Sequence, residues 1–248
     1  MLNLPIRPKK KRLSGLTAVT DTGIPVLELE YILSSYAKFL DVAKFGIGTA
    51  YIEPDLQNKI DLYREYDVLV YFGGTLFEKF YLQGKVSEYF KFLERYSINT
   101  VEISSGVVDI SIEDRCNLIE QAKNVGVEYV FSEVGSKDND SIMAPFEWIQ
   151  EMKLLLDAGC DMLITEGRGD ASAGIYRSNG EMREGLVKEI VEHIPMEKLM
   201  FEAPTTESQS TLIEKLGPAV NLANINIREL LLVEAQRQAL KYETFFIK

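Results

Sequence analysis

Several strand-like runs of the sequence carry a carboxylate at their C-terminal ends. Glu133, Glu166 and Glu202 each end an apolar run, and Glu102 lies inside the run Val-Glu-Ile-Ser. A buried carboxylate is costly unless it is paired or binds a metal. Carboxylates without histidine or thiolate partners form an all-oxygen environment, which suits Mg²⁺ better than zinc or copper. With Asp21, which ends the first such run, the predicted metal ligands are Asp21, Glu133, Glu166 and Glu202.

Positive charge accompanies these carboxylates. Lys44, Lys137 and Arg168 stand in or just after strand-like runs, next to loops that are rich in glycine. Such loops leave backbone N–H groups available to an anion. The segment Gly73-Gly74-Thr75 does not have the spacing of a P-loop or of a dinucleotide fingerprint. The pattern therefore favours a small phosphorylated or carboxylated substrate over a nucleotide.

Histidine and cysteine chemistry is disfavoured. The only histidine, His193, follows a helical pattern and stands two residues before Pro195, so we expect it at the end opposite the carboxylates. This excludes Ser-His-Asp and Cys-His triads and a histidine-ligated metal. Cys116 and Cys160 have no CxxC spacing, which indicates neither a disulfide framework nor a zinc site. Acid–base work is left to lysine, carboxylates or tyrosine.

The elements that must position these residues form a repeating pattern. Short apolar runs alternate with helical patterns, and eight such repeats in 248 residues predict a single (β/α)8 TIM barrel, with a closed parallel sheet. Catalytic residues of such barrels lie at the C-terminal ends of the strands. The predicted strands are 15–21, 42–45, 68–71, 100–103, 129–137, 162–165, 199–201 and 220–223. The predicted helices are 25–40, 55–66, 76–81, 86–96, 111–125, 145–158, 182–193, 208–216 and 227–240.

The composition limits which classes of protein this chain can belong to. We expect residues 1–14 to be a basic leader, solvated at Lys9 to Arg12, and residues 15–248 to be the catalytic barrel. The formal net charge of −11 disfavours a nucleic-acid partner. No run of eighteen apolar residues and no signal-like h-region occurs, which predicts a cytoplasmic protein without a membrane partner. Exposed aromatic residues leave room for a homo-oligomer.

Short motifs stand at the ends of the predicted strands and in the loops that follow them. They are Gly15-Leu16-Thr17, Lys44-Phe45-Gly46-Ile47-Gly48-Thr49, Gly73-Gly74-Thr75-Leu76-Phe77-Glu78, Val101-Glu102-Ile103-Ser104, Glu133-Val134-Gly135, Glu166-Gly167-Arg168, Phe201-Glu202-Ala203-Pro204 and Asn221-Leu222-Ala223-Asn224-Ile225. Together they resemble phosphosulfolactate synthase, over nearly all of Gly15 to Phe245. The resemblance implies a (β/α)8 barrel lyase that adds sulfite to phosphoenolpyruvate with Mg²⁺. The product would be (2R)-phospho-3-sulfolactate, a step toward coenzyme M biosynthesis in methanogens and toward sulfolactate elsewhere.

That chemistry gives each polar residue an expected role. Lys137 is the expected proton donor, and Glu102 is the second expected catalytic residue. A lysine that donates a proton near neutral pH needs its pKa lowered from about 10.4 to roughly 7–8, by nearby positive charge or the metal. The chain departs from the expected pattern at Ile47, where we expect an aromatic residue, and at Ser105, where we expect an acidic one. The expected substrate-binding residues are Lys44, Thr75, Ser104, Arg168 and Asn224.

Two other interpretations stay open from the residues. The chain could be another Mg²⁺-dependent lyase or aldolase that acts on a small phosphorylated carboxylic acid. It could also be a non-catalytic stress-related barrel, because plant heat-stress proteins are similar to the same family. A sulfite-dependent activity assay distinguishes an enzyme of sulfite addition from both.

Overall fold

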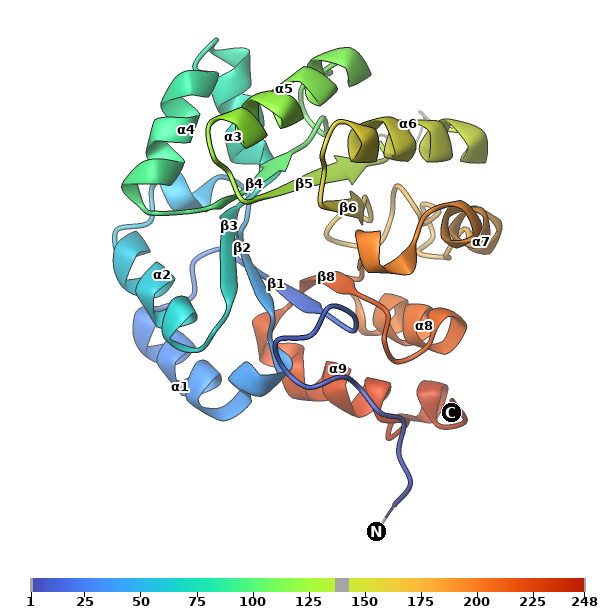
Figure 1. The fold of residues 1–248 in the computed structure, drawn as a ribbon. Coiled ribbons are helices and arrows are strands. Elements are labelled where there is room, and N and C mark those ends of the chain that lie inside the picture. The colour runs from blue at the N-terminus through green and yellow to red at the C-terminus, as the bar shows by residue number, and fades with distance from the viewer. Residues whose placement is uncertain (1, 137–142, 248) are drawn as a thin grey trace.

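Eight parallel strands close into a barrel in which each strand pairs with the next along the chain, and β8 pairs with β1 (Figure 1). The computed structural model describes residues 2–136 and 143–247. The predicted (β/α)8 TIM barrel is therefore confirmed. The strands are β1 (Thr17–Asp21), β2 (Val42–Phe45), β3 (Leu69–Phe72), β4 (Thr100–Ile103), β5 (Tyr129–Val134), β6 (Met162–Thr165), β7 (Leu199–Glu202) and β8 (Leu222–Ile225).

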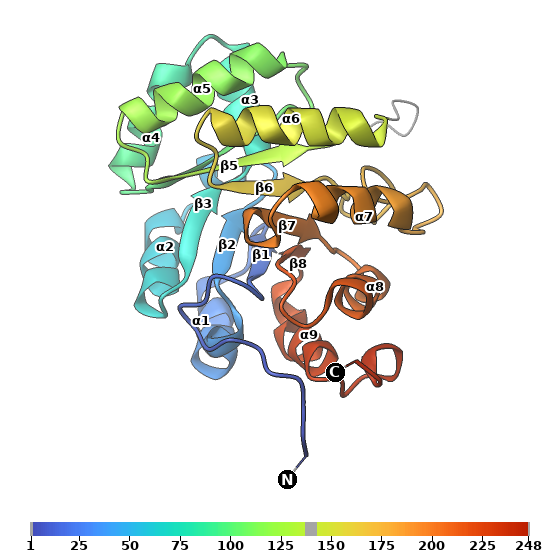
Figure 2. The same ribbon diagram turned by 45° about the vertical axis from the view of Figure 1, so that its right-hand side comes forward.

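Helices surround the barrel on its outer side (Figures 1 and 2). In the parts of the chain that the structure describes, no helix is both long enough and apolar enough to span a membrane. The α-helices are α1 (Val26–Tyr36), α2 (Leu56–Glu65), α3 (Gly74–Leu82), α4 (Val86–Arg95), α5 (Ile112–Asn124), α6 (Pro145–Asp157), α7 (Glu184–His193), α8 (Thr206–Leu216) and α9 (Leu230–Arg237). Short 3₁₀ helices lie at Ala37–Phe39, Thr49–Tyr51, Met196–Lys198, Ile227–Glu229 and Tyr242–Thr244.

The predicted bounds are confirmed for β2, β4 and β6 and shift for some other elements. β5 ends at Val134, and β8 begins two residues later than expected, at Leu222. α7 also begins late, because Tyr176 pairs with Met182 in an antiparallel bridge and the chain between them turns back on itself. A long connection, residues 166–183, therefore stands above the C-terminal end of β6.

The apolar residues divide into two clusters that reveal which way each strand side chain points. The larger cluster combines strand residues such as Val19 and Phe45 with the inner faces of the helices, so it fills the space outside the sheet. The smaller one contains only strand residues among its buried members and fills the inside of the barrel. Side chains alternate between the two sides along a strand. The buried members of this interior cluster are Ala18, Val42, Tyr71, Phe131, Ile164, Met200 and Ala223.

The N-terminal segment packs against the barrel end that lies opposite the strand C-termini. Arg7 Nη1 lies 2.6 Å from Glu234 Oε2 on α9, and its Nη2 lies 3.0 Å from Asp41 Oδ2, just before β2. Arg12 Nε lies 3.0 Å from the other Asp41 oxygen, and both arginine side chains are at most 4% exposed. Lys10 donates to the carbonyl oxygens of two helix ends. Within the run that we expect to be solvated, Lys9 and Lys11 are indeed exposed, whereas Lys10 is half-buried and the Arg12 side chain is buried against Asp41.

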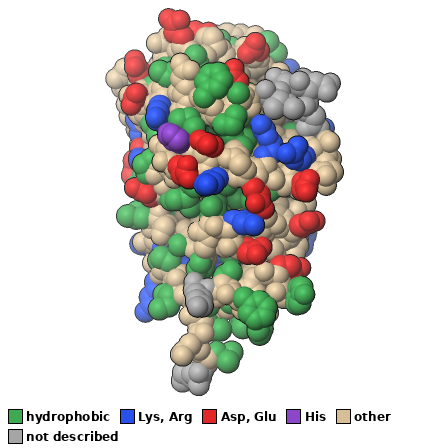
Figure 3. All heavy atoms as spheres, turned by 90° about the vertical axis from the view of Figure 1, so that its right-hand side faces the viewer, with side chains coloured by type: hydrophobic (Ala, Val, Ile, Leu, Met, Phe, Trp, Pro, Cys, Tyr) green, Lys and Arg blue, Asp and Glu red, His purple; other side chains and the backbone are tan. Residues whose placement is uncertain are grey.

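His193 lies where the sequence indicates. It ends α7, at the barrel end opposite the strand C-termini, and it is exposed on a surface where acidic and basic side chains are mixed (Figure 3). Its Nδ1 contacts the carbonyl oxygen of Glu189 at 2.8 Å, one turn earlier in the same helix. The position of His193 removes it from the chemistry of the opposite end.

Candidate functional site

Three glutamates come together inside the C-terminal mouth of the barrel. Glu133, Glu166 and Glu202 each offer one carboxylate oxygen, and these three atoms lie within 4.8 Å of one another. Each glutamate stands two positions after a member of the interior cluster, so its side chain points to the barrel axis. All three are buried, at 5%, 0% and 3% exposure. This arrangement confirms that the strand ends bring these carboxylates to one place.

Backbone amides of the turn after β6 fix two of these carboxylates. The N–H of Gly167 donates to Glu202 Oε2 at 3.0 Å, and the N–H of Arg168 donates to Glu166 Oε1 at 2.6 Å. Arg168 has a φ of 58°, a left-handed conformation that non-glycine residues rarely adopt. The turn therefore places consecutive backbone donors against two carboxylates and fixes their positions.

A buried cation lies among the carboxylates. Lys44 Nζ is 3.4 Å from Glu202 Oε1 and 3.5 Å from Glu102 Oε2, and the residue is 8% exposed. Burial lowers the pKa of the Lys44 amine, but the nearby carboxylates outweigh burial and raise it well above its ordinary value. Glu102 also accepts a hydrogen bond from the N–H of Gly74 at 2.7 Å, at the first residue of α3. Lys44 is thus a fixed positive charge rather than a proton donor.

Tyr71 is a mouth residue that the sequence interpretation missed. It is 1% exposed and belongs to the interior cluster, where its hydroxyl lies in the field of Lys44 and Glu102. Burial raises the pKa of this hydroxyl well above its ordinary value; Lys44 opposes the shift and Glu102 adds to it. A tyrosine in a continuously apolar strand carries no sequence signal of this role. Tyr71 stays protonated and is a poor proton donor.

Asp21 does not join the three glutamates. It stands three positions after Ala18 of the interior cluster, so its side chain points outward, toward α2. There Lys59 Nζ donates to Asp21 Oδ1 at 2.8 Å, and Tyr63 donates its hydroxyl to Oδ2 at 3.1 Å. The Asp21 and Lys59 side chains are both 0% exposed. The assignment of Asp21 as a metal ligand is therefore corrected to a structural ion pair.

We expect the substitution Asp21→Asn to lower the free energy of unfolding by about 3 kcal/mol, because it leaves the buried Lys59 ammonium short of a counter-charge. Mn²⁺ affinity should stay unchanged. Urea denaturation and metal titration of the same preparation measure the two quantities. A loss of metal affinity at unchanged stability would return Asp21 to the metal site.

Thr75 and Ser104 have other surroundings than expected. Ser104 donates its hydroxyl to Glu78 Oε1 at 2.6 Å, and Glu78 also accepts from backbone N–H groups of the loop after β4, at Val107 and Val108 among others. Thr75 lies in the first turn of α3 and lines a surface groove together with Ile47. We therefore reassign Ser104 from substrate binding to support of that loop, and Thr75 to the groove wall.

Asn224 lines a small cavity at the mouth. Its side-chain Oδ1 accepts from the Thr20 hydroxyl at 2.9 Å, and its φ of 58° falls inside β8, where the pairing of β8 with β1 shifts register. Pro204, from the loop after β7, and Gly169, next to the exposed Arg168, line the same cavity of about 280 Å³. The structure therefore brings two expected substrate-binding segments, those of Arg168 and Asn224, to one cavity.

Lys137, the expected proton donor, lies outside the described residues.

The donor set fits a hard cation. Two oxygens that both bind one Mg²⁺ directly lie at most about 4.2 Å apart, since each Mg–O distance is about 2.1 Å. Three carboxylate oxygens within 4.8 Å of one another are close enough to hold one such ion, directly or through water. The buried carboxylates and the lysine beside them could also orient a carboxylate or phosphate ester of a small substrate.

Comparison with known proteins identifies similar chains. A family model described as (2R)-phospho-3-sulfolactate synthase matches residues 5–243. The phosphosulfolactate synthase of Bacillus subtilis is 34% identical over 249 residues, which cover 99% of this chain and 98% of the relative. That of Methanocaldococcus jannaschii is 38% identical over 236 residues, 93% of this chain and 94% of the relative. Among solved structures, the YdjI aldolase from Escherichia coli K12 has a TM-score of 0.58 at 14% identity, over 94% of this chain and 86% of that one. A likeness at that identity supports the barrel fold alone.

Proposed function

Because the chain belongs to the phosphosulfolactate synthase family, we propose that it is a lyase that joins sulfite to phosphoenolpyruvate, with Mg²⁺, to give (2R)-phospho-3-sulfolactate. The observation that supports this most is the group of three buried carboxylates beside Lys44 at the C-terminal mouth. Catalytic residues of (β/α)8 barrels lie at that end.

Glu133, Glu166 and Glu202 are the residues that would hold Mg²⁺. When bound, Mg²⁺ supplies a Lewis acid that stabilises negative charge on the substrate carboxylate. The Gly167 and Arg168 amides keep Glu202 and Glu166 in place before substrate arrives. This preorganisation lowers the cost of arranging the charges during the reaction.

The substrate's anionic groups need separate partners. We assign the substrate carboxylate to Lys44, whose raised pKa keeps it protonated and whose amine lies beside the glutamates. We assign the phosphate to the cavity beside Asn224, which Gly169 also lines, with the neighbouring, exposed Arg168 as its expected cationic partner. Loops after strands seven and eight form phosphate sites in many such barrels. Arginine's planar fork suits a phosphate in particular.

The reaction requires one proton. The sulfite sulfur donates its electron pair to C3, the C2–C3 π electrons move onto the substrate carboxylate as an enolate, and a proton then bonds to C2. Lys44 is already held in ion pairs with Glu102 and Glu202, and the pKa values of Lys44 and Tyr71 are both raised, so neither is the preferred source of this proton. We therefore retain Lys137 as the proposed donor, with Glu102 beside Lys44 as the carboxylate that helps to hold that cation.

Replacement of Lys137 with alanine should lower kcat by about 10²-fold, the usual contribution of a positioned proton donor. The KM for phosphoenolpyruvate and the Mn²⁺ affinity should change little, since the residue acts on the proton and not on the anions. Steady-state kinetics and metal titration measure these values. A kcat within threefold of the wild type would remove Lys137 from the mechanism.

The test of the proposed function is a comparison of nucleophiles. The protein is incubated with phosphoenolpyruvate and Mg²⁺, and with sulfite, water, cyanide or an aldehyde as the second substrate, and products are followed by ³¹P NMR. We expect a new phosphate ester only with sulfite. A product formed with an aldehyde instead would favour an aldolase, and no turnover with any second substrate would favour a non-catalytic barrel.

A further inference from the structure

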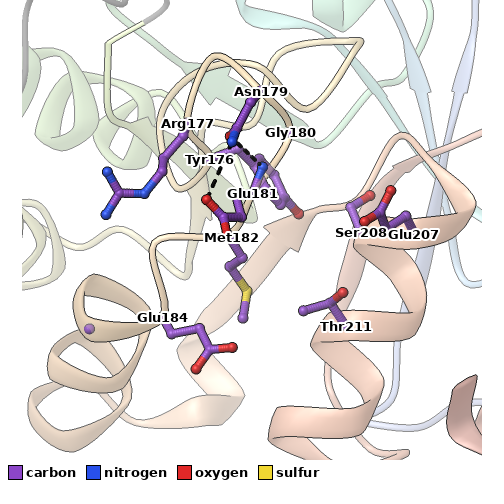
Figure 4. A pocket seen from close by; sticks show the side chains of 11 residues that line it. Tyr176, Arg177, Asn179, Gly180, Glu181, Met182, Glu184, Glu207, Ser208 and Thr211 are labelled. Carbon is purple, nitrogen blue, oxygen red and sulfur yellow. Dashed lines mark hydrogen bonds between the residues drawn. The ribbon is translucent and has the colours of Figure 1, made fainter.

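The connection between β6 and α7 returns to the mouth and contacts the backbones of two of the three glutamates. Its return segment, Gly174 to Tyr176, lies against Glu166 and Glu202, and the residues that follow, Arg177 to Met182, form the rim of a surface pocket (Figure 4). Tyr176 forms part of the wall of that pocket, opposite Glu207 and Ser208 at the start of α8. Tyr176 thus contacts both this surface pocket and the backbone of Glu202.

Gly174 brings this segment closer to Glu166 than any other residue would allow. The N–H of Ile175 donates to the Glu166 carbonyl oxygen at 3.0 Å. A Cβ at Gly174 would lie 1.9 Å from that same oxygen, and the φ of +61° adds a second requirement for glycine. The segment is therefore locked onto the backbone of Glu166.

Tyr176 makes the corresponding contact with Glu202. Its hydroxyl donates to the Glu202 carbonyl oxygen at 2.7 Å, and the residue is 3% exposed. Its ring presses on Gly167, where an added Cβ would lie 2.9 Å from Tyr176 Cε2 and 3.0 Å from Glu202 Cβ. Gly167 is the residue whose N–H donates to the Glu202 carboxylate. Tyr176 therefore holds both the backbone of Glu202 and the amide that orients its side chain.

The far side of the segment is anchored as well. Tyr176 pairs with Met182, and the N–H of Arg183 donates to the Ile175 carbonyl oxygen at 2.8 Å. Arg183 Nη1 donates to the Gly174 carbonyl oxygen at 3.0 Å. Its Nη2 donates to the carbonyl oxygen of Met143, just before α6, at 3.3 Å. These contacts hold the segment between α7 and the glutamates.

We propose that Tyr176 is a positioning residue for the metal ligands: through the Glu202 backbone and the Gly167 amide it holds the Glu202 carboxylate at the distance that a divalent cation needs. This inference rests on the proposed function of the three glutamates. Groups that orient metal ligands from behind are worth roughly 10- to 100-fold in metal affinity when they are removed.

The test compares Tyr176→Phe with Tyr89→Phe. Tyr89 is also a fully buried tyrosine, but it lies on α4 and packs against Phe77 and Phe80 of α3, and its hydroxyl has no hydrogen-bond partner among the described residues. Its variant therefore controls for removal of a buried hydroxyl that does not contact the glutamates. Mn²⁺ binding is measured by electron paramagnetic resonance without substrate, and kcat is measured as a function of Mg²⁺. We expect Tyr176→Phe to raise the Kd for Mn²⁺ about 10-fold and to leave kcat at saturating Mg²⁺ within about threefold. Tyr89→Phe should leave the Kd unchanged.

Other outcomes separate the inference from the proposed function. An unchanged Kd with a lower melting temperature would show that Tyr176 supports only the fold, and would overturn the inference while the metal site stands. Absence of Mn²⁺ binding by the wild type would overturn both. Arg183→Gln, which loosens the same segment from α7, provides a second variant. If Tyr176→Phe is too unstable to assay, an unchanged Kd for Mn²⁺ in Arg183→Gln contradicts the inference, and a raised Kd supports it.

Discussion

Replacement of Glu166 with glutamine should lower kcat/KM by at least about 10³-fold, the largest effect that the structure indicates for a single side chain. Glu166 is 0% exposed and shares the mouth with Glu133 and Glu202. Glutamine keeps the size of the side chain and an oxygen for the Arg168 amide, but it removes the charge that would attract the cation. Loss of a Lewis acid costs several kcal/mol of transition-state stabilisation, and each 1.36 kcal/mol is a factor of ten.

The matched control is Glu181→Gln, an exposed glutamate on the same connection between β6 and α7. It should leave both kcat/KM and Mn²⁺ affinity unchanged. Glu166→Gln should lose Mn²⁺ binding in parallel with activity. If activity fell while Mn²⁺ binding stayed intact, Glu166 would serve the substrate and not the metal.

The substitution Lys44→Met should lower kcat/KM for phosphoenolpyruvate by about 10³-fold. A buried, charge-assisted contact to an anion is worth about 2–5 kcal/mol, and here the ammonium also faces Glu102 and Glu202. The affinity for Mn²⁺ should rise, because the substitution removes a positive charge that repels the metal ion from the carboxylates. Opposite changes in substrate and metal affinity are the signature of a cation that binds the substrate.

The pH dependence follows from the direction of the Lys44 shift. The neighbouring carboxylates raise the pKa of the Lys44 amine above its ordinary value. At any pH below that ordinary pKa the amine is charged, and its ion pairs stabilise the fold fully. This stabilisation is lost only when the pH rises through the higher pKa of the folded state. Activity between about pH 6 and 9 should show no step from Lys44. The control Lys79→Met, an exposed lysine on α3, should change neither kinetics nor metal affinity. A fall in Mn²⁺ affinity in Lys44→Met would contradict the assigned role.

The strand ends could be predicted from sequence, because an apolar run that stops at a carboxylate and a turn is typical of a parallel strand that ends at a barrel mouth. Glu133, Glu166 and Glu202 follow this pattern. The same rule failed for Asp21, because strands of a closed parallel barrel are apolar on both faces and their sequence does not show which residues point inward. Only the position relative to Ala18 of the interior cluster separates the inward Thr20 from the outward Asp21.

Contacts between distant segments could not be predicted from the sequence, for a different reason. The partner of Ser104 is Glu78, which also accepts backbone N–H groups of a loop about thirty residues further along the chain. Arg7 pairs with Glu234 across nearly the whole sequence, and no local pattern shows that this N-terminal arginine packs against the barrel. The roles of Tyr71 and Tyr176 likewise depend on which distant segments become neighbours in the fold. Local sequence patterns do not show this.

The most direct test of the central claim is anomalous diffraction from crystals of the protein grown with Mn²⁺ and phosphoenolpyruvate. We expect one strong Mn²⁺ peak between Glu133, Glu166 and Glu202, with the substrate carboxylate beside Lys44 and its phosphate in the cavity at Asn224. A Mn²⁺ peak elsewhere, or phosphoenolpyruvate bound away from these carboxylates in an active enzyme, would contradict the account.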